Sequence, residues 1–272
     1  GVPRHLLDAG VKHPQCRAVV VLTGSDEMNL KIAVMTRFLN PKLQIICRDT
    51  DADHRDLLAT VGEVALISPF EIFAQQLSAA IYTPLLRAWE DWLVGDRSID
   101  LEHPLRPPRG NWVLCGYGRM GQALHEVLGT HGVAFSIIDT GEHLQEGDGQ
   151  RIRGRVDRNS LIDANLTDAV GLVAGTNNDE ENLRTLLSAR AVNPDAFLLV
   201  RQNRHENELA FNAANAHLIM QPSLVLARHI LLFLLTPSLG SLLRYLQTDG
   251  IGQVKDLARR SRERLPEGSP FL

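Results

Sequence analysis

Cysteine is scarce in this chain of 272 residues, which contains only Cys16, Cys47 and Cys115. Three scattered cysteines exclude a disulfide framework and a Cys-x-x-Cys metal site, and they favour a reducing compartment. An excess of positive charge is also absent, because 28 Lys and Arg stand against 32 Asp and Glu. The resulting net charge of −4 disfavours a general nucleic-acid binder, so we predict no nucleic-acid partner.

Long uninterrupted apolar runs are missing as well. The most apolar stretch, residues 218–243, is broken by Pro222, Arg228 and Pro237. It lacks the roughly 18 consecutive apolar residues of a membrane-spanning helix, so no span is predicted. The first residues show neither a signal-peptide pattern nor an initiator Met, and Gly1 is not expected to be the natural start.

An internal repeat is present. The segment at 23–30 (TGSDEMNL) resembles the segment at 176–183 (TNNDEENL), at an offset of 153 positions. The same offset pairs Arg37 with Arg190, Asn40-Pro41 with Asn193-Pro194, Arg48 with Arg201, and Pro69 with Pro222. Identities that stay in phase over this length indicate two copies of one structural unit.

Each copy alternates strand and helix patterns. In the second copy, strands are predicted at 111–115, 133–138, 169–174 and 196–200, with helices at 122–131 and 182–191. Such alternation favours an α/β fold with two Rossmann-like parallel-sheet units in tandem, the first lacking its N-terminal strands in this chain. The predicted domains are a first unit at 1–93, a linker at 94–109, a second unit at 110–235 and a helical, polar tail at 236–272, whose basic cluster is expected to be a solvated face.

A glycine loop is the chemical centre of the second copy. Residues 116–121 read Gly-Tyr-Gly-Arg-Met-Gly after a strand and before a helix, and Asp139 follows 18 positions beyond Gly121. This is the context of a dinucleotide-binding fingerprint. Gly116 permits the tight turn, Gly118 lets the backbone approach phosphate, and Gly121 allows close packing. Asp139 is predicted to accept the ribose hydroxyls; the alternative is a loop that has lost its ligand.

Acid–base machinery is not evident around this loop. No Gly-Lys-Ser/Thr of a P-loop is present, and none of Tyr82, Tyr117 and Tyr245 has a lysine four residues on. His125 and His131 are expected at the surface. We therefore predict that the chain senses a nucleotide without converting it and is not an enzyme. The alternatives are an NAD-dependent oxidoreductase and a Rossmann scaffold with no ligand.

These motifs together resemble the RCK, or TrkA-N, family, the regulator-of-potassium-conductance domains of potassium channels and Trk/Ktr transporters. The resemblance covers 110–235 fully and 1–93 as a unit without its first strands. It implies a nucleotide held over the glycine loop, by the acid ending the second strand and by the loop at Thr176. The residues so implied are Gly116, Tyr117, Gly118, Arg119, Met120, Gly121, Asp139, Thr140, Thr176 and Asn177.

One departure from the family concerns the end of the third strand. The family usually has Gly-Asp there, whereas this chain has Gly154-Arg155. An arginine loses the acceptor but can reach a phosphate, so Arg155 joins the predicted site. The cofactor therefore stays open between NAD(H) and an adenine nucleotide (ATP, ADP or AMP).

Several other polar residues have a structural and a functional interpretation. The Asp-Asn pairs 26/29 and 179/182 are predicted to cap helices. Arg48 and Arg201 suit an interface, a phosphate contact or a salt bridge. The Asp-x-Asp-x-Asp segment at 49–53 lacks the glycine and glutamate of a calcium loop, so it is predicted to be solvated and no metal is expected.

The resemblance implies a regulatory gating module on the cytoplasmic face of the cell membrane, with a potassium channel or transporter pore as its partner. The short connection at 94–109 favours a tandem channel regulator whose pore helices precede Gly1. The apolar stretch at 224–235 lies where the family has an interface-crossing helix. We therefore predict a homo-oligomer, from a dimer to a ring, whose conformation responds to nucleotide.

Overall fold

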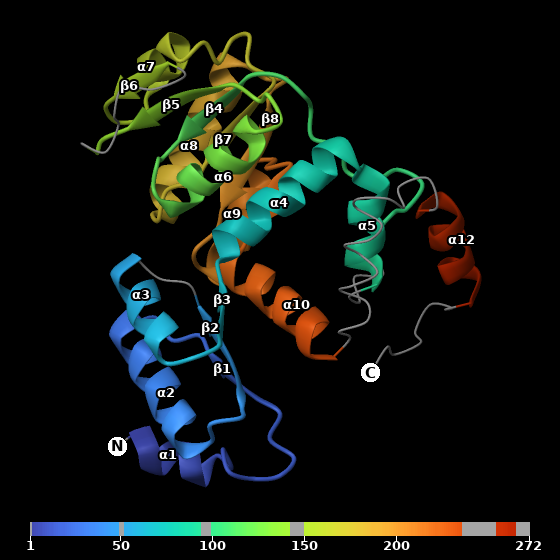
Figure 1. The fold of residues 1–272 in the computed structure, drawn as a ribbon. Helices are drawn as coiled ribbons and strands as arrows, with labels where there is room; N and C mark the ends of the chain where they lie inside the picture. Colours follow the sequence, from blue (N-terminus) through green and yellow to red (C-terminus); the bar gives the residue numbers. More distant parts are fainter. Residues whose placement is uncertain (1, 49–51, 94–98, 142–149, 236–253, 265–272) are drawn as a thin grey trace. The chain divides into compact units, whose positions relative to one another are not determined.

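A computed structural model describes residues 2–48, 52–93, 99–141, 150–235 and 254–264. The chain forms two compact units, Gly1–Ser68 and Pro69–Leu272, which we describe separately (Figure 1). Tyr245, Asp49 and Asp51 lie outside the described residues. Within the described part, no helix combines the length and the hydropathy needed to cross a membrane.

The first unit is built around a three-stranded parallel sheet in the order β1-β2-β3. Its elements are α1 (Val2–Asp8), β1 (Ala18–Val21), α2 (Asp26–Leu39), β2 (Gln44–Arg48), α3 (Ala52–Thr60) and β3 (Val64–Ile67). Apolar residues of both kinds of element form one core, including Val21, Ala33 and Ile45. Because the repeat aligns these strands with the last three of the second copy, the expected short first unit is confirmed.

The second unit contains a complete six-stranded parallel sheet in the order β6-β5-β4-β7-β8-β9. Its strands are β4 (Trp112–Cys115), β5 (Phe135–Asp139), β6 (Arg151–Arg153), β7 (Gly171–Ala174), β8 (Phe197–Arg201) and β9 (Leu218–Met220). The order reverses between β4 and β7, which makes that boundary the switch point of a Rossmann sheet. All residues of β4 and β7 are buried, as expected for central strands covered on both faces.

Helices connect and cover these strands. They are α4 (Pro69–Tyr82), α5 (Pro84–Leu93), α6 (Arg119–Gly129), α7 (Arg158–Asp163), α8 (Asp179–Val192), α9 (Glu208–Ala213), α10 (Pro222–Leu235) and α12 (Val254–Arg264), with a 3₁₀ turn at His205–Asn207. On α12, Arg259 and Arg260 both pair with Asp256 at 2.8 Å on an exposed face. This part of the tail is the solvated helix face that the sequence predicts.

Two arginines at equivalent positions of the repeat make equivalent hydrogen bonds. Arg37 donates to the Pro41 and Glu63 carbonyl oxygens, and Arg190 donates to the Pro194 and Asn215 carbonyl oxygens. Each arginine thus ties the end of its helix to the loop before the next strand. The identities that reveal the repeat are therefore explained by backbone carbonyls that need a donor.

The compact division falls at 68/69, earlier than the boundary at 93 expected from the repeat. Helix α4 is apolar along most of its length, and it packs on α6 and α10 of the second unit. Helix α5 buries Trp89 and Trp92 in a cluster with Val254 and Ala258 of α12. Both helices therefore belong to the second unit by packing, although the repeat assigns them to the first.

Candidate functional site

The predicted site residues converge on one edge of the six-stranded sheet. In a parallel sheet all carboxyl ends lie at the same edge, and ligands of open α/β sheets bind there at the switch point. The glycine loop follows β4, Asp139 ends β5, Arg155 follows β6, and Thr176 follows β7 (Figure 1). Thr140, Arg155 and Asn177 are exposed, whereas Met120 is fully buried, so only its backbone faces the loop.

The three glycines of the loop have distinct environments. Gly116 has φ +97°, a conformation that favours glycine. A Cβ on Gly121 would collide with the Gly116 carbonyl oxygen, so this glycine is required for the close approach of α6. Gly118 has φ −72° and no atom within 4 Å of a Cβ, so the space beside it is open. It precedes α6 without a side-chain cap, which leaves the helix N-terminus available to an anion.

Asp139 joins the glycine loop to the loop after β5. Its Oδ2 accepts from the Tyr117 backbone N–H at 2.5 Å, and its Oδ1 accepts from the Gly141 backbone N–H at 2.6 Å. A carboxylate has about four acceptor positions, so each oxygen retains a lone pair. The half-buried carboxylate can therefore hold the loop in place and still accept two hydroxyl groups.

His125 corrects the expectation that both histidines near the loop are surface residues. Its Nδ1 lies 2.7 Å from the Tyr117 hydroxyl, and its ring packs edge-on against Phe135. His125 is half-buried because α6 directs it between Tyr117 and the sheet. His131 is exposed as predicted. The Tyr117 ring is further covered by the Arg151 guanidinium, 5.5 Å from its centroid.

Asn182 braces the loop that carries Thr176. Its Oδ1 accepts from the Thr176 backbone N–H at 3.0 Å and hydroxyl at 2.8 Å, while its Nδ2 donates to the Thr176 and Arg201 carbonyl oxygens. Asn29 makes the same bonds with Thr23 in the first unit. The predicted capping role of these asparagines is wrong, because both lie a turn inside their helices.

The helix caps are instead Ser25 and Asn178, whose side chains accept from the first free N–H groups of α2 and α8. Asp179 turns away to the loop after β8, where it accepts from Asn203, Arg204 and Asn207. Burial opposes its ionisation, but the hydrogen bonds from Asn207 and Asn203 outweigh burial and lower the pKa of Asp179. The carboxylate thus holds this loop as an anion.

Reactive groups are scarce beside the glycine loop. Burial raises the pKa of the Cys115 thiol, which directly precedes Gly116, so it stays protonated and non-nucleophilic. Among the residues that the structure describes, no group of three or more His, Cys, Asp or Glu side chains is arranged to hold a metal ion. The geometry of this edge is suited to binding a phosphate and a ribose.

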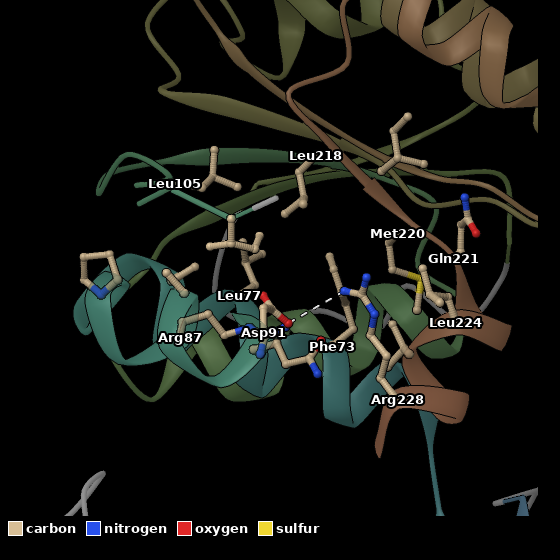
Figure 2. Close-up of a pocket in the computed structure, with 17 residues that line it drawn as sticks. Phe73, Leu77, Arg87, Asp91, Leu105, Leu218, Met220, Gln221, Leu224 and Arg228 are labelled. Atoms are coloured by element: carbon tan, nitrogen blue, oxygen red, sulfur yellow. Dashed lines mark hydrogen bonds and ion pairs between the residues drawn. The ribbon is translucent and has the colours of Figure 1, made fainter. Parts of the chain in front are cut away.

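A cavity of about 280 Å³ lies among α4, α5, β9 and α10 (Figure 2). Apolar side chains such as Phe73, Leu77 and Met220 line most of it. Asp91 lies at its wall, 2.7 Å from Arg87 and 3.7 Å from Arg228. No predicted nucleotide-binding residue lines this cavity, and its one carboxylate, Asp91, is paired with two arginines, so the open edge remains the candidate site.

Comparison with solved structures shows the same fold. The crystal structure of the GsuK RCK domain superposes with a TM-score of 0.61 at 19% identity, covering 91% of this chain and 66% of that one. GsuK bound to ADP gives 0.61 at 22% identity (88% and 56%), and the GsuK channel bound to NAD gives 0.61 at 18% identity (92% and 56%).

Curated relatives include two proteins of Methanocaldococcus jannaschii. Probable potassium channel protein 2 is 23% identical over 133 residues, and potassium channel protein 1 is 28% identical over 101 residues. The matches span 46% and 35% of this chain but only 39% and 30% of those proteins. The TrkA-N domain model matches residues 3–69 and 112–222. With both copies matched, the chain belongs to the TrkA-N family.

Proposed function

We propose that this chain is a nucleotide-sensing regulatory module that gates potassium flux through a channel or transporter at the cytoplasmic face of the membrane. Membership of the TrkA-N family and similarity to two proteins named as potassium channels support the proposal. The similar GsuK protein is itself a channel. Potassium and the pore are therefore the partners to test first.

The observation that carries the proposal is the arrangement of the glycine loop and Asp139 at the switch point of the sheet. Gly118 is open beside an uncapped helix N-terminus, and Asp139 retains acceptor positions next to it. The first suits a phosphate and the second a ribose. The ligand we propose is NAD(H) or an adenine nucleotide, in keeping with the ADP and NAD bound to GsuK.

In this proposal the nucleotide is a signal and is not turned over. A ligand that binds one conformation more tightly than another shifts the equilibrium by its difference in affinity, typically about 1–3 kcal/mol. The Cys115 thiol, which burial keeps protonated, supplies no activated nucleophile at the loop. An NADH absorbance assay against a substrate panel should therefore show no turnover.

The direct test is calorimetric titration of the chain with NAD⁺, NADH, ATP, ADP and AMP. We expect saturable binding of at least one nucleotide, and potassium flux through the full-length protein should respond to that same nucleotide. Absence of binding by all five would contradict the proposal and favour an empty Rossmann scaffold.

We further propose that the chain forms a homo-oligomer through α10. Val225, Leu226 and Ile230 of this helix are buried within the unit, whereas Leu224 and Leu231 are 43% and 48% exposed. Exposed leucines on an apolar helix are a common feature of association surfaces. Light scattering should give a mass of at least two chains, and Leu231→Glu should lower it. A stable monomer at high concentration would contradict this.

A further inference from the structure

Arg155 lies at the same edge of the sheet as the proposed nucleotide site, one strand beyond Asp139. Strand β6 pairs with β5 in parallel, with Arg153 opposite Asp139, and the Gly154 backbone N–H donates to the Asp139 carbonyl oxygen at 2.9 Å. Arg155 therefore follows directly after the residue that is bonded to the end of β5. Figure 1 shows the order β6, β5, β4 across this half of the sheet.

The Arg155 backbone is fixed, whereas its side chain is available to a ligand. Its carbonyl oxygen accepts from the Ser160 hydroxyl at 3.1 Å, and Ser160 forms the capping box of α7 with Asp157. Asp157, the acid nearest to Arg155 in sequence, accepts from the Ser160 N–H at 2.8 Å. The arginine is exposed, and among the residues that the structure describes its guanidinium has no hydrogen bond, ion pair or ring contact. Its N–H donors are thus presented at this edge without an acceptor.

The position of Arg155 determines which part of a nucleotide it can meet. In the proposed site the 5′-phosphate lies at Gly118 after β4, and the ribose lies at Asp139 at the end of β5. Phosphate and base are attached to opposite sides of a ribose, so the base extends from β5 toward β6. Arg155 is two strand spacings, about 10 Å, from the strand that carries the glycine loop. In that arrangement Arg155 meets the base, and the 5′-phosphate lies on the other side of Asp139.

We infer that Arg155 reads the base and that the site prefers a 6-oxopurine, guanine or hypoxanthine, to adenine. The inference rests on the proposed nucleotide-sensing function and goes further in the class of base. The O6 and N7 atoms of guanine are two adjacent acceptors, which a guanidinium contacts in bidentate fashion. Adenine has its N6 amino group, a donor, in the place of O6, and an arginine has no acceptor for it. Adenine nucleotides remain ligands, because Gly118 and Asp139 hold the phosphate and the ribose of either kind.

The test is calorimetry on the whole chain with ADP, GDP and IDP, which differ only in the base. In the wild type we expect GDP and IDP to bind about fivefold or more tightly than ADP, the lower end of the discrimination that a bidentate base contact provides. IDP lacks the 2-amino group of guanine, so similar affinities for GDP and IDP would identify O6 and N7 as the atoms that are read. Because the three ligands carry the same phosphates, general effects of charge on phosphate binding cancel in the GDP-to-ADP affinity ratio.

Substitutions of Arg155 separate base reading from the other effects of its charge. Arg155→Gln replaces the guanidinium by an amide with both a donor and an acceptor, and the GDP-to-ADP ratio should fall close to one. Arg155→Asp replaces donors by acceptors and should invert the ratio in favour of ADP. The matched control is Arg184→Gln, which removes an exposed arginine of α8 and should leave the ratio unchanged. The unfolding temperature should stay the same in all three variants, since both arginines are exposed.

The outcomes distinguish this inference from the proposed function. A wild type that binds ADP as tightly as GDP, or an Arg155→Gln variant that keeps the wild-type ratio, would overturn the inference and leave the proposed function standing. An affinity for IDP as low as that for ADP would do the same, because O6 and N7 would then not be the atoms that are read. Failure of the wild type to bind any adenine or guanine nucleotide would overturn both.

Discussion

At the residue scale, substitutions at Gly118 and Gly121 are expected to have different effects: one on ligand binding and the other on stability. The Cβ of a valine at Gly118 meets no protein atom within 4 Å and needs no strained φ, but the side chain fills the space where we expect phosphate to approach. We expect Gly118→Val to abolish nucleotide binding and to cost about 0.5–1 kcal/mol through the poorer helix cap. Calorimetry and thermal unfolding of the variant measure the two effects.

The control for this prediction is Gly121→Ala. Its methyl group would meet the Gly116 carbonyl oxygen, so α6 must move away from the loop. Overpacking of this kind typically costs about 1–3 kcal/mol, and the unfolding temperature should fall several degrees. A Gly118→Val variant that binds as tightly as the wild type would identify the loop as a relic.

Asp139 gives the second prediction at this scale. Asp139→Ala removes the acceptor for the ribose and should weaken nucleotide binding by about 1.5–3 kcal/mol, the usual value for hydrogen bonds to a charged group. It also leaves the Tyr117 and Gly141 N–H groups without their acceptor, so some stability is lost. Titrations well below the unfolding temperature isolate the affinity change. Unchanged affinity would place the ribose elsewhere.

Local spacing allowed part of the site to be predicted from the sequence. A strand, a glycine loop and an acid 18 residues later determine the position of Asp139, because parallel strands share an edge. The half-buried position of His125 could not be predicted in this way, since helical spacing does not reveal that its ring packs against Tyr117 and Phe135. The role of Asn182 was also missed, because a local capping pattern does not reveal that Ser25 and Asn178 fill the caps.

At the scale of elements, the two copies offer a matched pair of asparagines. Both side chains are fully buried. Asn182 hydrogen-bonds to Thr176 and to the Arg201 carbonyl oxygen, and Asn29 hydrogen-bonds to Thr23. Asn182→Ala leaves buried donors and acceptors unpaired, and we expect a loss of about 2–4 kcal/mol in the free energy of unfolding. Because Thr176 is a predicted nucleotide-binding residue and would lose the hydrogen bonds that hold its loop, nucleotide affinity should also fall.

The matched variant Asn29→Ala should destabilise the first unit by a similar mechanism and leave nucleotide affinity unchanged. Denaturant unfolding and calorimetry on both variants test the difference. Equal losses of affinity in the two variants would show that the brace in the second unit has no special connection with the ligand. The comparison uses the repeat as its own control, since both asparagines bond to the threonine that follows a central or edge strand.

Alternating patterns predicted the order of elements well. The predicted strand at 133–138 is observed as β5, and the predicted helix at 182–191 extends back to Asp179 because Asn178 caps it. The division into compact units was less predictable. Pro69 and Pro222 start equivalent helices, yet α4 packs with the second unit, and a repeat in sequence contains no information about which neighbour covers a helix.

At the scale of the whole molecule, the division at 68/69 leads to a prediction about fragments. Every candidate nucleotide-binding residue lies in the unit Pro69–Leu272. A fragment of residues 69–272 retains the cores around the sheet and around α5, so it should unfold cooperatively. We expect its nucleotide affinity to agree with that of the full chain within about threefold.

A fragment that begins at residue 110, where the repeat starts its second copy, should behave differently. It lacks α4 and α5, so the buried face of α10 and the residues Val254 and Ala258 of α12 lose their partners. The deletion removes many buried side chains, including Trp89 and Trp92. We expect the resulting loss in the free energy of unfolding to exceed the total of about 5–15 kcal/mol that a typical domain has. We expect this fragment to bind a hydrophobic dye and to unfold at a lower temperature over a broader range. Equal unfolding temperatures for the two fragments would show that α4 and α5 are appendages and that the boundary inferred from the repeat is the structural one.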